Sequence, residues 1–205
     1  RGEMRLPRPV CGRQTQFNAE RPPTVPITPL HLGPALVLKA GTGKTMSLTV
    51  FAFSQVAMDV EVLVRIIIDA DRLHGFSNTI FGASIVLFPS VLLGRPVCRA
   101  FLNWWNRNLS AKQRELLAVD PKISWLAAWS GGILGVYSHW FLDAMMHADA
   151  LAVWPLARGN PFIDWLSIGE INGLCLGSLV VGLLAFGVMA GIRRIRKQVS
   201  LSNSR

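Results

Sequence analysis

Five apolar segments, separated by polar or basic connections, dominate the hydrophobic pattern of the chain. They cover residues 30–40, 47–68, 79–97, 125–146 and 173–192. The last three have close to the ~20 residues that a helix needs to cross the hydrocarbon of a membrane. The first is too short to cross alone without tilting or re-entering, and Pro89 is expected to kink the third. The pattern predicts an all-α fold: a polytopic membrane helical bundle with four to five apolar helices.

The expected domain organisation is a single membrane-embedded helical domain, residues 28–197, between two disordered tails, 1–27 and 198–205. The first tail is rich in Pro and Arg and nearly free of acids, as is typical of disorder. The chain begins with Arg1 rather than Met. A natural start at Val25, read from a GTG codon, is a hypothesis that N-terminal sequencing would test.

The charge distribution indicates membrane orientation. The chain carries 21 Lys and Arg against 12 Asp and Glu, a net charge of +9, with 51% hydrophobic residues. In a soluble protein this balance would suggest nucleic acid, but here much of the positive charge flanks apolar segments. The basic connection 98–124 and the cluster 193–197 are predicted to be cytoplasmic, which places connections 65–78 and 148–172 on the other side. The predicted partner is therefore the lipid bilayer, with no nucleic acid.

One helix carries ionisable residues at membrane depth. His139, Asp143 and His147 are each four residues apart, which places them on one helical face. Gly135 and Gly131 continue this face and are expected to let a neighbouring helix approach closely. Buried ionisable groups in membranes normally face a partner, a cavity or a metal, and imidazole with carboxylate suits zinc. The alternative is a structural hydrogen-bonded seam between helices.

Other candidate residues converge on the same end of the predicted bundle. His31 and Asp59 reach a similar depth if the first two segments form a hairpin, and His74 lies in the next connection on that side. Each has a plain structural alternative: His31 as a helix cap, His74 as a loop histidine, and Asp59 as an ion partner of Arg65. Asp69 is an ordinary loop charge on the same view. A ligand role for the convergent histidines is nevertheless favoured.

Several short motifs together resemble a family of bacterial membrane-bound proteins described as metal-dependent hydrolases. They are Thr28-Pro29-Leu30-His31, an Asp near the end of the next helix, His74-Gly75-Phe76-Ser77-Asn78-Thr79, and Ser138-His139-x-x-x-Asp143. The resemblance covers most of residues 26–192 and includes a distant likeness to zinc phospholipase C. It implies a bacterial inner-membrane protein with a metal site built from His31, Asp59, His74, His139 and Asp143. Asn78 departs from the family pattern, which has a histidine there.

The predicted function is metal-dependent hydrolysis at the non-cytoplasmic ends of the helices. A divalent metal, with zinc as the first candidate, would lower the pKa of water toward ~7. His147 is a further candidate ligand, and Glu61 or Asp69 could act as general base. The location suggests a lipid or amphiphilic ester or phosphodiester as substrate. A non-catalytic alternative is an ion or proton transporter, or a scaffold, that uses the same polar cluster.

Overall fold

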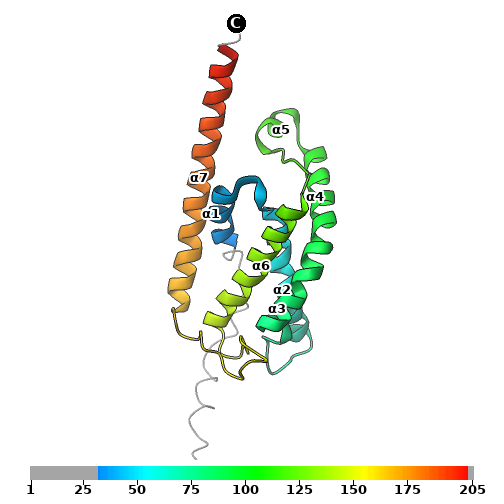
Figure 1. Ribbon diagram of the computed structural model, residues 1–205, viewed down its shortest axis with the longest axis vertical. Helices are drawn as coiled ribbons and strands as arrows, with labels where there is room; N and C mark the ends of the chain where they lie inside the picture. The colour runs from blue at the N-terminus through cyan, green and yellow to red at the C-terminus, as the bar shows by residue number, and fades with distance from the viewer. Residues whose placement is uncertain (1–31, 203–205) are drawn as a thin grey trace, which may run out of the picture.

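The computed structural model describes residues 32–202, and every regular element in that range is helical (Figure 1). The α-helices are α1 (Gly33–Thr42), α2 (Leu48–Ile67), α3 (Ile80–Leu92), α4 (Gly94–Asn108), α5 (Ala111–Leu117), α6 (Trp125–Met146) and α7 (Ile168–Ser202). Two 3-10 turns, η2 (Gly43–Thr45) and η3 (Phe76–Asn78), precede α2 and α3. The all-α prediction is confirmed for the described residues. The predicted tail 1–27 lies outside them.

Hydroxyl side chains set the first residues of three helices. Ser47, Thr79 and Ser124 each accept a hydrogen bond from the backbone N–H three residues later, at 3.3, 2.9 and 3.1 Å. Such caps satisfy donors that a helix start leaves without a partner. The Ser47 backbone N–H also donates to the Ala127 carbonyl at 2.9 Å. The beginnings of α2 and α6 are thereby tied together, within a residue of the predicted bounds.

The contact between α2 and α6 depends on two glycines. A Cβ added to Gly131 would overlap the Ser47 carbonyl oxygen, and one added to Gly135 would overlap the Ser54 hydroxyl. The expectation that these glycines admit a neighbouring helix is confirmed. Val136, on the same helix, is buried in the core that α2, α3, α4 and α6 share. This close approach is what brings polar groups of α2 within reach of α6.

The third predicted segment is two helices rather than one kinked helix that ends at residue 97. α3 continues through Pro89, and the chain breaks at Leu93 with a bend of 44° before α4. The physical reason is Pro96, which has no N–H for the Leu92 carbonyl and whose ring crowds that carbonyl. α4 then runs to Asn108, and the short α5 follows it. The sequence pattern had predicted neither the extension nor α5.

α7 packs closely against α1 at two glycines, one on each helix. A Cβ on Gly33 would overlap the Cys175 carbonyl oxygen, and one on Gly182 would overlap the Leu36 side chain. Four other glycines of α7 have open space where a Cβ would lie: Gly173, Gly177, Gly187 and Gly191.

α7 is longer than the predicted segment at both ends. It begins at Ile168 because Ser167 and Glu170 cap each other's backbone N–H groups, at 3.2 and 2.8 Å. It continues to Ser202 because no Gly or Pro follows Gly191 to end it. The predicted domain boundary at residue 197 therefore falls inside this helix.

Length and composition single out α7 as a candidate membrane span. Residues Ile168–Met189 have a mean hydropathy of 2.1, and α3 with α4 qualifies as a second span if the bent pair is taken as one. No other described helix reaches this hydropathy and length by itself. The mean hydropathy of α6 is lowered by its glycines, its tryptophans and the polar residues of its second half. That of α2 is lowered by Asp59, Glu61 and Arg65.

The two ends of the bundle differ in what they carry. The connections after α2 and after α6 lie together at one end, whereas α5 and the C-terminal part of α7 lie at the other (Figure 1). This arrangement agrees with the predicted pairing of the 65–78 and 148–172 connections. The candidate polar residues in the described part of the chain gather at that first end.

Candidate metal centre

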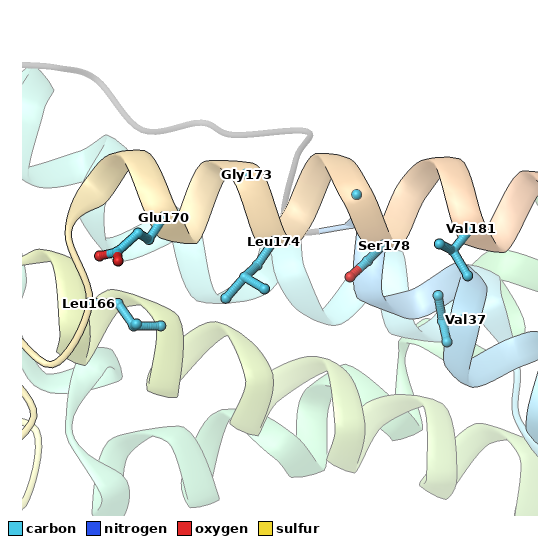
Figure 2. Close-up of a pocket in the computed structure, with 8 residues that line it drawn as sticks. Val37, Leu166, Glu170, Gly173, Leu174, Ser178 and Val181 are labelled. Atoms are coloured by element: carbon cyan, nitrogen blue, oxygen red, sulfur yellow. The ribbon is translucent and has the colours of Figure 1, made fainter.

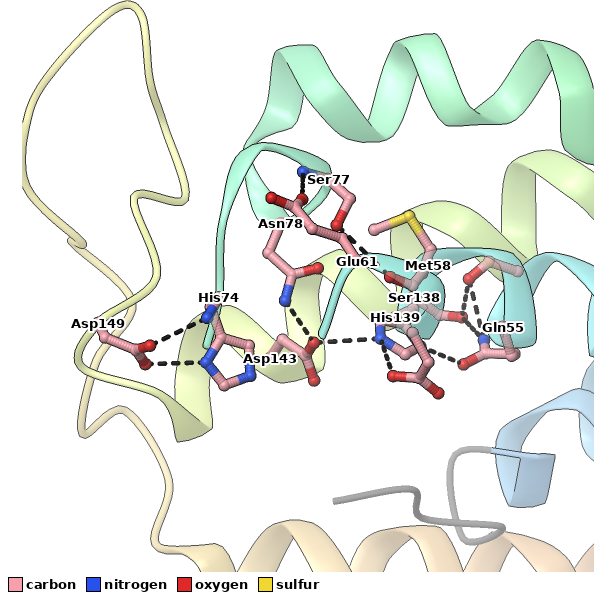
Figure 3. Close-up of polar contacts among 12 residues, drawn as sticks. Gln55, Met58, Glu61, His74, Ser77, Asn78, Ser138, His139, Asp143 and Asp149 are labelled. Carbon is pink, nitrogen blue, oxygen red and sulfur yellow. Dashed lines mark hydrogen bonds and ion pairs between the residues drawn. The ribbon is translucent and has the colours of Figure 1, made fainter. Parts of the chain in front are cut away.

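The second half of α6 supplies two buried ionisable side chains. His139 and Asp143 are 1% and 3% exposed, and both point to the α2 side of the helix (Figure 3). His147 follows the last helical residue, with extended backbone angles, and its N–H donates to the Asp143 carbonyl at 2.9 Å. Of the three residues predicted to share one helical face, His139 and Asp143 lie in the helix, and His147 follows its end. His147 still joins the site through another partner.

His139 lies between groups from two helices. Its Nε2 is 3.1 Å from Asp143 Oδ2 and 3.3 Å from Asp59 Oδ1, and its Nδ1 is 2.8 Å from Gln55 Oε1. Gln55 and Asp59 are four residues apart on α2, so they share the face that meets α6. The structure thus brings three of the predicted ligands together and adds Gln55, which sequence reasoning missed.

The loop before α3 delivers Asn78 to this group. Asn78 is 1% exposed, and its Nδ2 donates to Asp143 Oδ2 at 3.0 Å. Its Oδ1 is buried and has no hydrogen-bond partner within residues 32–202. Asn78 therefore occupies the place where the family pattern has a histidine, and its side chain does contact the site.

Glu61 anchors that loop. Its Oε1 accepts from Phe76 N at 2.9 Å, its Oε2 accepts from Ser77 N at 2.5 Å, and Arg65 forms an ion pair with it at 2.8 Å. A carboxylate that already holds three donors is poorly placed to take a proton from water. A Cβ at Gly75 would meet the ends of the Glu61 and Arg65 side chains, which would have to shift to admit it.

A second group forms around His74, which is 3% exposed. Asp149 accepts from the backbone N–H of Leu73 at 3.1 Å and of His74 at 3.0 Å, and its Oδ1 is 2.8 Å from the ring Nδ1 of His74. The His74 and His147 rings are stacked, with centroids 3.8 Å apart and an interplanar angle of 20°. Two sequence-distant segments, around His74 and around His147 and Asp149, thus meet at one point.

These three residues could hold a metal ion. One ligand atom from each of His74, His147 and Asp149 lies within 4.8 Å of the others. The donor set of two imidazoles and a carboxylate is the type that binds zinc and similar divalent ions. The buried Nε2 of His74 has no hydrogen-bond partner in the described part of the chain, and it faces Asp143 rather than Asp149 (Figure 3). The residues fit a metal ion.

The electrostatics of Asp149 support such a role. Burial disfavours its charged form, but the hydrogen bond from the His74 ring and the positive charge that His74 and His147 can carry outweigh burial. The pKa of the Asp149 carboxyl therefore lies well below its ordinary value. Asp149 is an anion at neutral pH, as metal binding and the orientation of an imidazole both require.

The remaining candidates are placed as follows. His31 lies outside the described residues. Asp69 is exposed in the turn that ends α2, where its φ is 51°. Asp149 was missed, although it follows His147 by only two residues in the same connection. Gln55 was missed because an amide is not a usual ligand, yet its spacing of four from Asp59 was the available signal.

A groove that described residues form lies elsewhere. It has a volume of about 630 Å³ and runs along α7 and α1, lined by Val37, Leu166, Glu170, Gly173, Leu174, Gly177, Ser178 and Val181 (Figure 2). Small and aliphatic side chains dominate it, and Glu170 is its one ionisable residue. The buried histidines do not line it, so chemistry is assigned to the polar group rather than to this groove.

Comparisons with known proteins add no identity: no protein-family model, no curated protein and no solved structure matches the chain. The resemblance to membrane-bound metal-dependent hydrolases therefore stays a prediction.

Proposed function

We propose that this protein is an integral-membrane, metal-dependent hydrolase whose site lies at the end of the bundle formed by the connections after α2 and α6. The observation that carries the proposal is the group of His74, His147 and Asp149, in which one ligand atom of each residue lies within 4.8 Å of the others. Perturbed ionisable groups gathered at one place are typical of functional sites. The neighbouring His139 and Asp143 extend the same group.

The proposed metal is zinc. Two imidazole nitrogens and a carboxylate leave one tetrahedral position open, which is the pattern of catalytic rather than structural zinc sites. A bound zinc ion supplies Lewis acidity, which polarises an ester or phosphoryl oxygen and makes water acidic near neutral pH. Asp149 would hold the ion together with the two imidazoles, and Glu61 holds the loop that presents His74. The stacking of His147 on His74 fixes both rings.

The membrane part of the proposal goes beyond α7, the one described helix that is by itself long and apolar enough to span a membrane. We propose that α2, α3 with α4, and α6 also lie within the bilayer of a bacterial inner membrane, with α1 beside α7. The basic residues of the α4–α6 connection would then face the cytoplasm, and the metal group would face the opposite side. A lipid or another amphiphilic ester or phosphodiester is the substrate class that can reach such a site.

Cysteine labelling tests the orientation. Glu115→Cys in α5 and Arg158→Cys in the connection after α6 are each introduced into a chain without Cys11, because Cys98 and Cys175 are buried. In intact spheroplasts, a membrane-impermeant maleimide should label position 158 and leave position 115 unlabelled. Equal labelling of both positions contradicts the proposed orientation.

Metal analysis with an activity assay tests the function. Detergent-purified protein should contain zinc in stoichiometric amount, and His74→Ala and His147→Ala should each reduce it. Hydrolysis of phosphatidylcholine and of bis(p-nitrophenyl) phosphate is then measured with and without chelator. The matched control is Asp71→Asn, an exposed carboxylate near His74 in sequence. Zinc binding without hydrolysis favours a transporter or scaffold, and absence of zinc from the native protein refutes the proposal.

A further inference from the structure

We infer that the end of α4 and the start of α5 form a binding site for the phosphate of an anionic phospholipid headgroup, with Arg107 and Arg114 as the residues that hold it. The site lies at the end of the bundle opposite the candidate metal centre (Figure 1). The inference goes beyond the proposed hydrolysis, and it does not depend on the metal group.

An open pocket of about 340 Å³ lies between α4 and α5. It is lined by Asn103, Asn106, Arg107, Arg114 and Ala118. Asn103 and Arg107 are four residues apart on α4, so they project from one side of that helix. Arg114 belongs to α5 and reaches the same space from the other wall. Two guanidinium groups and two amides therefore converge from two helices.

Hydrogen bonds hold α5 and the chain after it against α4. The Asn106 side chain pairs with the backbone of Val119: its Nδ2 donates to the carbonyl at 2.7 Å, and its Oδ1 accepts the N–H at 3.1 Å. Trp105 Nε1 donates to the Leu117 carbonyl at 3.1 Å, and Arg114 donates to the Asn106 carbonyl at 3.3 Å. Because the chain itself holds the walls of the pocket, binding costs little conformational entropy.

The positive charge of the pocket is not balanced by nearby acids. None of the ion pairs in the described part of the chain includes Arg107 or Arg114. Residues 94–124 hold six Lys and Arg and two acids, Glu115 and Asp120, and neither acid lines the pocket. A guanidinium presents a planar fork of N–H donors that matches the oxygens of a phosphate. The pocket offers no carboxylate to the amine of a zwitterionic headgroup, so an anionic headgroup fits it better.

Apolar side chains next to the pocket indicate that the phosphate belongs to a lipid. Phe101 and Trp104 on α4 are 50% and 59% exposed, with ring centroids 5.8 Å apart. Leu117 and Val119, which flank Ala118 in the sequence, are 47% and 49% exposed. Aromatic residues are enriched where a protein meets the headgroup region, and basic residues there attract anionic lipids. Acyl chains would cover these side chains, whereas a free phosphate would leave them in water.

Lipid titration followed by native mass spectrometry tests the site. Full-length protein in a mild detergent is titrated with dioctanoyl phosphatidylglycerol, and the fraction of protein that carries lipid is measured. Arg107→Gln and Arg114→Gln should each weaken binding about fivefold, and the two together about 25-fold if their effects are independent. Arg99→Gln is the matched control, because Arg99 is an exposed arginine of α4 that does not line the pocket. This variant should bind as tightly as the native chain.

The variants distinguish a defined site from a diffuse attraction. Equal weakening in Arg99→Gln and Arg107→Gln would mean that the basic connection attracts anionic lipid without a pocket, which overturns the inference. Native affinity in Arg107→Gln overturns it as well. Arg114→Gln also removes the hydrogen bond to the Asn106 carbonyl. If that variant loses the structure of α5, Arg107→Gln decides, because Arg107 has no hydrogen bond or ion pair within the described residues.

Arg107→Lys separates the planar fork from the charge. It keeps the positive charge but offers no pair of parallel N–H donors, so its affinity should stay below that of the native chain. Native affinity in Arg107→Lys would mean that charge alone is recognised, which contradicts a site built for phosphate.

Three further probes identify the source of the phosphate. Glycerol phosphate has no acyl chains, and dioctanoyl phosphatidylcholine carries a neutralising amine, so each should bind at least about tenfold more weakly than phosphatidylglycerol. Trp104→Ala should weaken binding of phosphatidylglycerol and leave that of glycerol phosphate unchanged. Equal affinities for glycerol phosphate and phosphatidylglycerol would identify a soluble phosphate as the ligand. Tighter binding of a polyglutamate peptide would identify an acidic protein segment, and either result overturns the lipid.

Discussion

Asp149 binds His74 twice, across 75 positions of the chain. One carboxylate oxygen accepts the His74 backbone N–H at 3.0 Å, and the other lies 2.8 Å from the ring Nδ1. The backbone contact places the residue and the ring contact sets its tautomer, so Nδ1 carries the hydrogen and Nε2 points inward. A single loop carboxylate therefore fixes both the position and the chemistry of the central histidine.

Asp149→Asn should weaken zinc binding about 10–100-fold, because an amide neither attracts the cation nor holds the His74 ring as strongly. Zinc affinity is measured by competition with a chromophoric chelator. Asp164→Asn is the matched control: it lies exposed in the same connection, and asparagine tolerates its φ of 62°. Equal losses in the two variants would argue against a specific role for Asp149.

Gly135→Ala should destabilise the bundle by about 1–3 kcal/mol, because the added Cβ would overlap the Ser54 hydroxyl on α2. Gly187→Ala on α7 meets open space and should be neutral or slightly stabilising, since alanine favours a helix. The midpoint of thermal unfolding in detergent, followed by circular dichroism, measures both. A neutral Gly135→Ala variant would mean that the two helices separate without cost.

Glu61→Ala should loosen the loop that contains His74, because Glu61 holds this loop by hydrogen bonds and is not expected to transfer a proton. The Phe76 and Ser77 amides lose their acceptor, so their hydrogen exchange should become faster by at least tenfold relative to the amides of α6. Glu61→Gln retains one acceptor oxygen and should have an intermediate effect. Unchanged exchange together with lost hydrolysis would identify Glu61 as the general base after all.

Asn78→His should raise zinc retention, because an imidazole at this buried position would add a ligand next to Asp143. The measurement is zinc content after dialysis against a weak chelator. Asn78→Ala removes the contact with Asp143 without adding a ligand and should lower retention. If both variants retain the native amount, position 78 does not belong to the metal centre.

Much of the helical framework could be predicted from apolar periodicity and caps. The bounds of α6 were predicted correctly, and those of α2 to within one residue, because Ser47 and Ser124 precede unbroken helical segments. The break at Leu93 was not predicted, since its cause, Pro96, acts on a carbonyl four residues earlier. The hydrophobic pattern also predicted more membrane spans than there are described helices with the length and mean hydropathy of a span.

The candidate site was predicted less completely, for a physical reason. His139 and Asp143 share a helical face, so their spacing revealed them. Asp149 and Gln55 act through tertiary contacts that no local spacing encodes: one returns from a loop to His74, and the other reaches across from α2 to His139. Residues that orient ligands are harder to find in a sequence than the ligands themselves.

The amide of Gln55 spans the seam between α2 and α6 at the turn where Gly135 lets the two helices meet. The distance between α2 and α6 and the orientation of the His139 ring therefore both depend on this one contact. A bulkier side chain at this contact would turn the His139 ring away from its partners while the fold was retained. The orientation of the His139 ring would then be lost before the fold, and fewer substitutions at this contact would preserve that orientation than thermal stability alone suggests.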